Sequence, residues 1–289
     1  MRPRVFSSLL LAWALLSVPA TGQTPALEPD LQGHWLHDAV LATHSVEDGI
    51  DPGNEIIADL SRFVSRSGER YPIVVVDPAD GRIPYQSAAA KKREEFLANH
   101  IDTPTKLEHI DPHARSLLDG VPRANYDPAG GLQIVQVPGY VLMLYEVNHG
   151  YRVIPMDGRP HAGENIKLWI GDSRGHWEGN TLVVDVTNQN DRTWIDGHGS
   201  FHSDALHVVE RWTLVSPNRI DYEVTIDDPK VFTRPWKMAF AMNRRTEQGY
   251  EQLEDSRFEG ERDVEKTLEG GRRDKEAGRT GVHDHRRAR

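Results

Sequence analysis

The residues from Gly139 to Trp212 constrain the fold more than any other stretch of the 289-residue chain. Short runs rich in Val, Leu, Ile and Tyr alternate there with turn sequences such as Asn148-His149-Gly150 and Glu178-Gly179-Asn180. Runs of this length, broken this often by turn residues, are typical of antiparallel strands joined by tight connections. A meander of such strands curls into a sandwich or a barrel.

The same pattern continues on both sides of this stretch, where Gly33-x-Trp35 resembles the start of the first strand in lipocalins. We therefore expect a mostly β fold: an antiparallel, lipocalin-like (calycin-like) barrel or a strongly curved sheet, with short helices and a charged C-terminal tail. The predicted strands are one near Trp35, Tyr71–Asp77, Leu132–Val137, Tyr140–Val147, Arg152–Met156, Ile166–Ile170, Thr181–Thr187, Leu206–Leu214, Arg219–Ile226 and Lys237–Met242.

Outside these strands the sequence predicts two helices and an irregular segment. Apolar residues at helical spacing indicate a helix over 54–65, and Ser87 to Leu97 predicts a second one with Ser87 as its N-cap. The expected organisation is a signal peptide over 1–22, a barrel-like domain over 23–250 with a helical or irregular insertion or lid over 54–131, and a tail over 251–289. The tail is rich in charge, so we expect a helix that frays into a largely disordered end.

The N-terminus has the layout of a secretory signal peptide. Arg2 and Arg4 precede the apolar run Leu9–Leu16, which is too short to span a bilayer, and small residues follow it. The prediction is an exported protein, periplasmic or extracellular, and the alternative is a retained membrane anchor. The chain has no cysteine, so it forms no disulfide and uses no thiol chemistry.

The net charge of −10 limits the partners. An acidic surface argues against nucleic acid and against anionic membranes, and no run after the leader is apolar and long enough for stable membrane insertion. The expected partner is a small apolar or cyclic molecule. The sequence contains no P-loop and no dinucleotide fingerprint, so no cofactor is predicted, and it contains no nucleophile elbow.

Alternation along Leu206–Leu214 places Glu210 on the same face as four apolar residues, and therefore in the interior. A buried carboxylate is costly unless it is paired or protonated. Two interpretations follow: a structural ion pair with an arginine, or a catalytic general acid or base.

Three histidines, His149, His161 and His207, are the best candidates for proton transfer, and Asp157 lies close to the second in sequence. Histidine with a carboxylate partner is the usual pair for acid–base work near neutral pH. We predict His149, His161, Asp157 and Glu210 as catalytic residues. Three histidines and a glutamate also suit zinc or iron, although no tight chelating spacing is present, so no metal ligand is assigned.

The substrate-binding residues that we predict are the side chains able to line or anchor a pocket: Arg159, Arg211, Trp169, Trp177, Trp212, Tyr222 and His207. The arginines would hold an anionic group. The aromatic residues would contact a flat apolar ligand. Alternatively, they belong to the hydrophobic core.

Several of these segments resemble an uncharacterised family of secreted bacterial proteins. The resemblance rests on Ile154-Pro-Met-Asp-Gly-Arg-Pro-His161, Gly171-Asp-Ser-Arg-Gly-His-Trp-Glu-Gly-Asn-Thr-Leu-Val-Val184 and Leu206-His-Val-Val-Glu-Arg-Trp212, and it covers roughly Tyr71 to Tyr250. It implies a secreted protein and a domain boundary, and it implies no reaction. The chain departs from the family pattern at Arg257-Phe258-Glu259-Gly260, where Cys-His-Glu-Gly is expected.

Three functional hypotheses follow. The first is a cofactor-free lyase, isomerase or hydratase that binds a small apolar or cyclic molecule in the barrel cavity, where His161 and His149 exchange protons. The second is a periplasmic lipocalin-like carrier of an apolar ligand. The third is a metal-dependent hydrolase that uses the histidines and glutamate.

Overall fold

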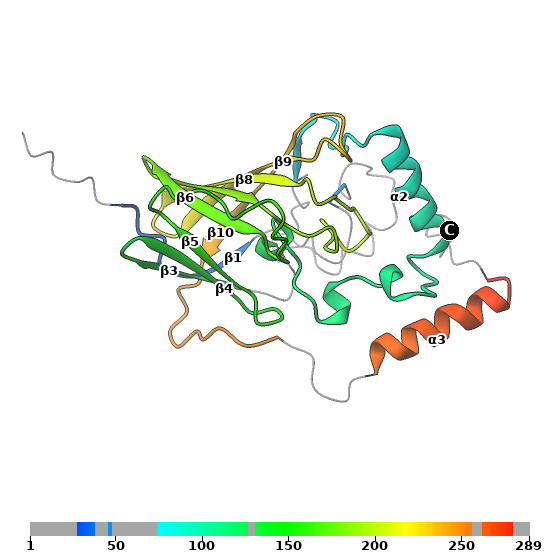
Figure 1. The fold of residues 1–289 in the computed structure, drawn as a ribbon. Helices are drawn as coiled ribbons and strands as arrows, with labels where there is room; N and C mark the ends of the chain where they lie inside the picture. The colour runs from blue at the N-terminus through cyan, green and yellow to red at the C-terminus, as the bar shows by residue number, and fades with distance from the viewer. Residues whose placement is uncertain (1–27, 38–45, 48–73, 127–130, 256–261, 280–289) are drawn as a thin grey trace, which may run out of the picture.

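The computed structural model describes residues 28–37, 46–47, 74–126, 131–255 and 262–279 (Figure 1). The predicted signal peptide over 1–22 and the predicted helix over 54–65 lie outside these residues. The described chain contains ten strands, two α-helices and three short 3₁₀ helices. The fold is therefore mostly β, as predicted.

All strand pairs in the sheet are antiparallel, and the sheet is nearly closed into a barrel (Figure 1). The strands are β1 Gly33–His37, β2 Val75–Asp77, β3 Leu132–Val137, β4 Tyr140–Tyr145, β5 Tyr151–Pro155, β6 Asp172–Glu178, β7 Thr181–Thr187, β8 His207–Ser216, β9 Arg219–Asp227 and β10 Trp236–Arg244. Their order is β5-β4-β3-β1-β10-β9-β8-β7-β6, and β2 pairs with β10 outside this path. The two end strands lie close together: Nε of Arg152 on β5 donates a hydrogen bond to Oγ of Ser173 on β6 at 3.3 Å.

The interior of the barrel is filled by side chains. Residues of alternating positions point inward from every strand of the barrel, and the largest of them are fully buried. This core includes Trp35, Trp212, Trp236, Tyr222, Met143, Ile154, Leu182, Val184 and Val224. The barrel interior is therefore a close-packed hydrophobic core, and its polar groups lie at one end.

The prediction of a strand over Ile166–Ile170 is wrong. Those residues form an irregular connection with one isolated bridge, Leu168 to Gln189, and the strand comes next, as β6. Apolar periodicity missed β6 because its sequence is mainly polar and contains Gly175. The glycine is needed where β6 meets β5, since a Cβ there would lie 2.8 Å from Cγ2 of Ile154.

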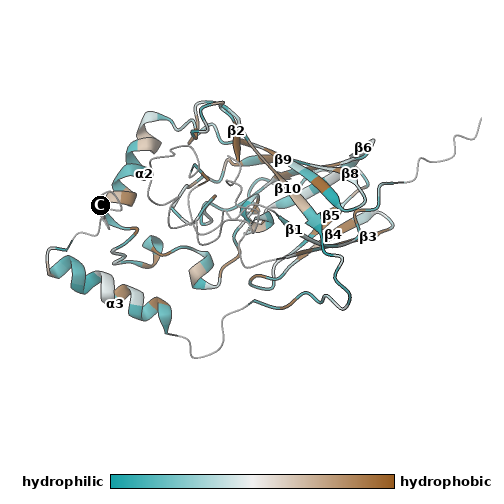
Figure 2. Ribbon diagram, turned by 180° about the vertical axis from the view of Figure 1, so that it is seen from behind, coloured by the Kyte–Doolittle hydropathy of each residue, from teal (hydrophilic) through white to brown (hydrophobic). Residues whose placement is uncertain are grey.

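A cap of helices and loops covers one end of the barrel, and Figures 1 and 2 place both helices at that end. Helix α2 (Ser87–Asn99) confirms the prediction, although its N-cap position is Gln86. The short helices η2 Leu107–His109, η3 His113–Arg115 and η4 Arg123–Asn125 follow it, in the segment predicted to be irregular.

Helix α3 (Asp263–Glu276) is largely hydrophilic (Figure 2), and its buried residue is Gly271, where a Cβ would lie 2.2 Å from the carbonyl oxygen of Pro104. In the described part of the chain, no helix has the length and apolar character needed to cross a membrane.

Strand β4 is apolar on both faces, a pattern that predicts a central position or a covering segment. It lies next to the end strand β5, and its outer face is partly exposed. Leu144 on that face is 37 % exposed. The apolar outer face is thus a surface feature that the barrel interior does not explain.

Candidate functional site

The cap end of the barrel encloses a charged pair. Arg152 on β5 and Glu210 on β8 point inward across the interior and are fully buried. Nη2 of Arg152 donates to Oε2 of Glu210 at 2.5 Å, and Nη1 donates to Oε1 at 3.2 Å. Glu210 is therefore in the interior, as its alternation predicted, and the ion pair anticipated as one interpretation is present.

Polar side chains from other elements complete the hydrogen bonding of this pair. Oε1 of Glu210 also accepts from Nδ2 of Asn125 on η4, at 2.6 Å, and from the hydroxyl of Tyr222 on β9, at 3.0 Å. The hydroxyl of Tyr145 on β4 donates to Oδ1 of Asn125 at 2.9 Å, and Ser173 accepts from Arg152. We call these six residues (Asn125, Tyr145, Arg152, Ser173, Glu210 and Tyr222) the interior network.

Burial and charge pairing shift the pKa values of three members of the interior network, Tyr145, Tyr222 and Arg152. Burial raises the pKa of Tyr145 to about 12 and that of Tyr222 well above its ordinary value, so both remain hydroxyl donors. Burial alone would lower the pKa of Arg152, but the adjacent carboxylate of Glu210 raises it. Since the charges are matched and hydrogen-bonded, the network is suited to holding η4 on the barrel.

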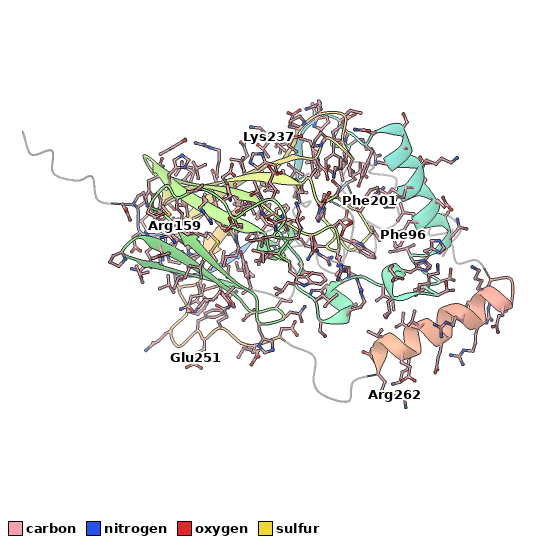
Figure 3. All side chains as sticks on the ribbon, viewed as in Figure 1. Phe96, Arg159, Phe201, Lys237, Glu251 and Arg262 are labelled. Carbon is pink, nitrogen blue, oxygen red and sulfur yellow. The ribbon has the colours of Figure 1, made fainter. Side chains whose placement is uncertain are left out.

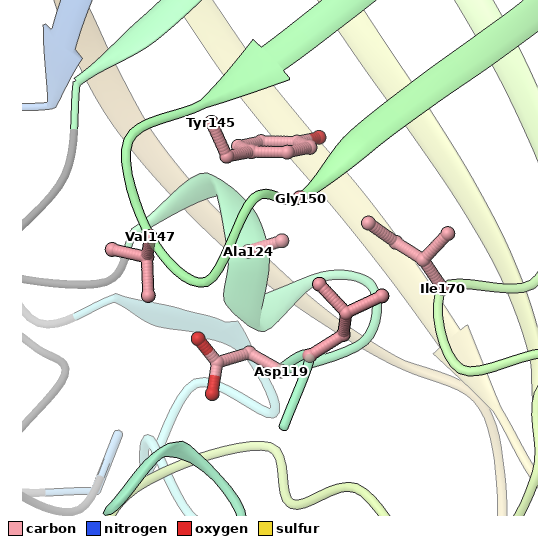
Figure 4. A pocket seen from close by; sticks show the side chains of 7 residues that line it. Asp119, Ala124, Tyr145, Val147, Gly150 and Ile170 are labelled. Carbon is pink, nitrogen blue, oxygen red and sulfur yellow. The ribbon is translucent and has the colours of Figure 1, made fainter. Parts of the chain in front are cut away.

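A small hollow lies at the cap end, beside the interior network (Figure 4). The ring of Tyr145 and the residues Val147, Gly150, Ala124 and Ile170 surround it together with Leu118 and Asp119. Its space outside the atoms is about 240 Å³, part of it open to solvent. The part of it that the centre of a water-sized sphere can occupy is about 10 Å³, which is room for about one water molecule.

A second polar cluster lies on the outer face of β6, β7 and β8. Asp185 on β7 is shared by two histidines: Nε2 of His161 lies 2.8 Å from its Oδ1, and Nε2 of His207 lies 2.7 Å from its Oδ2. The side chains of His161, Asp185 and His207 are 26 %, 38 % and 44 % exposed. His161 and His207, both predicted from the sequence, are therefore joined through Asp185, which was not predicted.

His161 is held from both sides of its ring. Its Nδ1 lies 3.2 Å from Oδ2 of Asp172 on β6, which also accepts from the backbone N–H of Ala162 at 2.8 Å. Arg174 donates to the other oxygen of Asp172 at 2.6 Å. A carboxylate only accepts hydrogen bonds, so both contacts of His161 are hydrogen bonds when both ring nitrogens carry hydrogen. We call His161, Asp172, Arg174, Asp185 and His207 the outer cluster.

The cluster shifts the pKa values of its members in a consistent direction. The hydrogen bond that His207 donates to Asp185 raises the pKa of His207, against partial burial. Partial burial tends to raise the pKa of Asp185, but the hydrogen bonds from His207 and His161 lower it overall. The pKa of Asp172 is also lowered, because the N–H of Ala162 and the Arg174 guanidinium outweigh burial. Both aspartates are thus ionised near neutral pH.

The other predicted catalytic residues lie apart from the outer cluster, each with a partner at the surface. His149, in the turn between β4 and β5, lies 2.5 Å from Glu254. Asp157 pairs with Arg159, which also donates to the hydroxyl of Tyr140 at 3.2 Å. Figure 3 shows Arg159 over the barrel, away from the cap where Phe96 and Phe201 are labelled.

The remaining predicted binding residues divide between core and surface. Trp212 and Tyr222 are buried in the core, 4.6 Å apart between ring centroids. Trp177 is partly buried against the core, and Trp169 is partly buried in the connection before β6. Arg211 is on the outer face of β8, where its Nη2 donates to Glu178 at 2.9 Å.

The sequence analysis identified His161, His207 and Glu210 but not the residues that bind them. Asp185 lies in the run Thr181–Thr187 as its only charged residue, and Arg152 opens the run Arg152–Met156. A charged residue inside an otherwise apolar strand was therefore the available signal for both. Asn125 in η4 carried no such signal, because its role depends on where the cap contacts the barrel.

Within the described residues no group of three or more His, Asp or Glu side chains has a geometry that could hold a metal ion. The outer cluster instead forms direct hydrogen bonds between its imidazoles and carboxylates.

The chain matches no protein-family model and no curated protein. Among solved structures it is similar to a variant of the fluorescent protein UnaG, with 13 % sequence identity and a TM-score of 0.24 over 41 % of this chain and 73 % of that one. The assignment of a barrel-like fold therefore rests on the strand pairing of the chain itself, and the candidate site rests on its geometry.

Proposed function

We propose that the chain is an acid–base enzyme, of the lyase, isomerase or hydratase type, that acts on a small molecule at the outer cluster. The observation that carries the proposal is the Asp185–His207 pair. Nε2 of His207 is bonded to Asp185 at 2.7 Å, and Nδ1 has no hydrogen-bond partner in the described part of the chain. A carboxylate on one imidazole nitrogen orients the ring and favours its protonated form, so the other nitrogen can exchange a proton with a substrate.

In this proposal His161 has a different role from the one that the sequence suggested. Both of its ring nitrogens face carboxylates, so it has no free nitrogen for a substrate in this arrangement. It orients Asp185 from the side opposite His207. His207 then takes the place of His149 as the proton-transferring group, because His149 is paired with Glu254 elsewhere.

The barrel interior is filled by the core and the interior network, so we place the substrate over the outer faces of β7 and β8 rather than in a barrel cavity. The resting proton sits on Nε2 of His207 when Asp185 accepts a hydrogen bond from it, which leaves Nδ1 as the base. The substrate then needs an acidic C–H or O–H group, and the conjugate acid of His207 returns the proton in a later step.

The proposal is tested by hydrogen–deuterium exchange, which detects proton abstraction even when no product is known. A panel of small ketones, hydroxy acids and cyclic carbonyl compounds is incubated with the protein in D₂O and followed by NMR. We expect exchange at a carbon acid that is lost in His207→Gln and Asp185→Asn and kept in His176→Gln, an exposed histidine on β6 paired with Glu178. Exchange that persists in His207→Gln would contradict the proposal.

A second candidate is a carrier of a small apolar ligand, which is supported by the mainly apolar lining of the hollow at the cap end; the ligand would have to widen this hollow. A carrier would bind its ligand equally well after His149→Ala and His161→Ala are combined. The substitution Ile170→Trp, which fills the hollow, would abolish binding. NMR titration with small apolar ligands separates these outcomes from the enzyme.

We also propose export to the periplasm or the extracellular space, supported by the signal-peptide pattern over 1–22. Intact mass measurement of the protein from its host is expected to give a chain that begins near Gln23. A full-length mass would contradict it.

A further inference from the structure

Two histidines of the cap stack against each other. The ring of His100, the residue that ends α2, and the ring of His109, the last residue of η2, lie 3.9 Å apart between centroids and 20° from parallel. Phe96 on α2 packs beside both rings, at 6.1 Å from His100 and 6.3 Å from His109. If both imidazoles were protonated, two positive charges would lie in direct contact, and their repulsion would oppose the stack.

A backbone hydrogen bond requires His109 to be neutral. The N–H of Thr105 donates to Nδ1 of His109 at 3.2 Å. A ring nitrogen that accepts a hydrogen bond carries no hydrogen, so the hydrogen of the His109 ring is on Nε2. Protonation would place a hydrogen on Nδ1 as well, and the bond would be lost. His109 therefore fixes the backbone of Thr105 only while it is neutral.

Helix α3 rests on the residue just before Thr105. A Cβ on Gly271, the buried residue of α3, would lie 2.2 Å from the carbonyl oxygen and 2.8 Å from the nitrogen of Pro104. Val264 and Leu268, seven and three residues before Gly271, share its face of the helix and are partly buried. Figure 1 shows α3 beside the loop that follows α2. Since so little of α3 is buried, its attachment depends on the position of Pro104.

We propose that the stacked pair His100–His109 is a pH switch that releases α3 from the cap in acid. Protonated His109 no longer accepts from Thr105 and is repelled by the second imidazole when that ring is also charged. The loop over 103–105 then moves, and Gly271 loses its contact with Pro104.

The groups that face His109 set the direction of the pH dependence. Partial burial and the charges of His100, Lys106 and Lys275 on α3 lower the pKa of His109 below its ordinary 6.5, whereas Glu108 on η2 opposes this shift. After release the pKa returns toward 6.5, so the released form binds the proton more readily. The attachment of α3 is therefore complete above 6.5, weakens as pH falls below 6.5, and changes no further below the lowered value.

A distance between α2 and α3, followed against pH, tests the proposal. The chain has no cysteine, so spin labels react only at the two introduced positions of Glu94→Cys and Arg272→Cys, both exposed. We expect one short distance by double electron–electron resonance well above pH 6.5. At about pH 5, where most carboxylates are still ionised, we expect a longer and broader distribution.

Three further substitutions identify the group that controls release. His109→Gln should keep α3 attached at about pH 5, because the amide oxygen still accepts from Thr105 and does not titrate. Lys275→Gln, at an exposed position of α3, should move release to a lower pH by a few tenths of a unit, since it removes a charge that opposes protonation. The matched control is His176→Gln on β6, away from the cap, which should leave the transition unchanged.

Four results would overturn the proposal. They are attachment of α3 in the original protein at about pH 5, release above 6.5, and release of His109→Gln at the same pH as the original protein. The fourth is an absent or upward shift in Lys275→Gln, which decides the question even if His109→Gln disturbs the cap. None of these results depends on the proposed acid–base function, because no residue of the outer cluster takes part.

Discussion

The interior network and the outer cluster share two strands, β6 and β8, which contribute side chains to them from opposite faces. β6 turns Ser173 inward and Asp172 outward, and β8 turns Glu210 inward and His207 outward. Both sites pair a basic side chain with a carboxylate at hydrogen-bond distance. They differ in exposure: the Arg152–Glu210 pair is fully buried, whereas Asp185 and His207 are 38 % and 44 % exposed.

Because of this difference in exposure, we expect the interior network to stabilise the fold and the outer cluster to exchange protons. In the interior network each charge is matched and has no access to a substrate, so loss of one partner should mainly destabilise the fold. In the outer cluster water screens the charges, so the same type of pair contributes little to stability and remains free to exchange protons. Four substitutions test this contrast, from the largest expected effect to the smallest.

Arg152→Met should destabilise the protein by about 3–5 kcal/mol, because it leaves the Glu210 carboxylate buried without its cation. Urea denaturation measures the free energy of unfolding. The control is the double variant Arg152→Met/Glu210→Leu, which removes both charges and should recover most of the loss. If the single variant is nearly as stable as the original protein, the interior network does not hold the fold.

Tyr222→Phe should cost about 1–2 kcal/mol in the same assay. It removes the hydroxyl that donates to Glu210 and accepts from Asn125, while the ring still packs on Trp212. A neutral result would mean that Asn125 and Arg152 satisfy Glu210 without Tyr222.

Asp185→Asn should lower the pKa of His207, and the effect on stability should depend on pH. The folded pKa of His207 is above its ordinary 6.5, so the stabilisation is complete below 6.5 and is lost as pH rises through the raised value. The folded pKa of Asp185 is below 3.8, so its contribution is present above 3.8 and is lost as pH falls through the lowered value.

The stability difference between the original protein and Asp185→Asn should therefore be largest between these two ordinary values. With both groups partly exposed it should stay below about 1 kcal/mol. NMR titration of the His207 ring and denaturation at several pH values measure the two effects. Glu178→Gln, which leaves Asp185 untouched, is the control. A His207 pKa that does not change in Asp185→Asn would remove the basis of the proposed proton transfer.

His161→Ala should have the smallest effect on stability, because its contacts are partly exposed, yet it should abolish turnover by releasing Asp185. Thermal unfolding and the deuterium-exchange assay separate these effects. A large fall in melting temperature would instead make His161 a structural residue.

The barrel-like fold was predictable because it depends on local patterns. Alternation in β8 was sufficient to place Glu210 inside, and the turn sequences separated most strands correctly. β6 could not be found in this way, because its polar residues and Gly175 suit a position at the junction with β5 that only the closing sheet creates. The partial exposure of the outer face of β4 was not predictable for the same reason, since apolar residues on both faces do not say what covers them.

The sequence by itself determined the β architecture, the burial of Glu210 and the histidines that merit attention, because each follows from residue type and strand period. The tertiary structure decided which residues become partners. It joined His161 to His207 through Asp185, gave Glu210 to Arg152, and left His149 and Asp157 with other partners at the surface. Such pairings depend on strand order and register, which bring together side chains far apart in the chain and which no local pattern encodes.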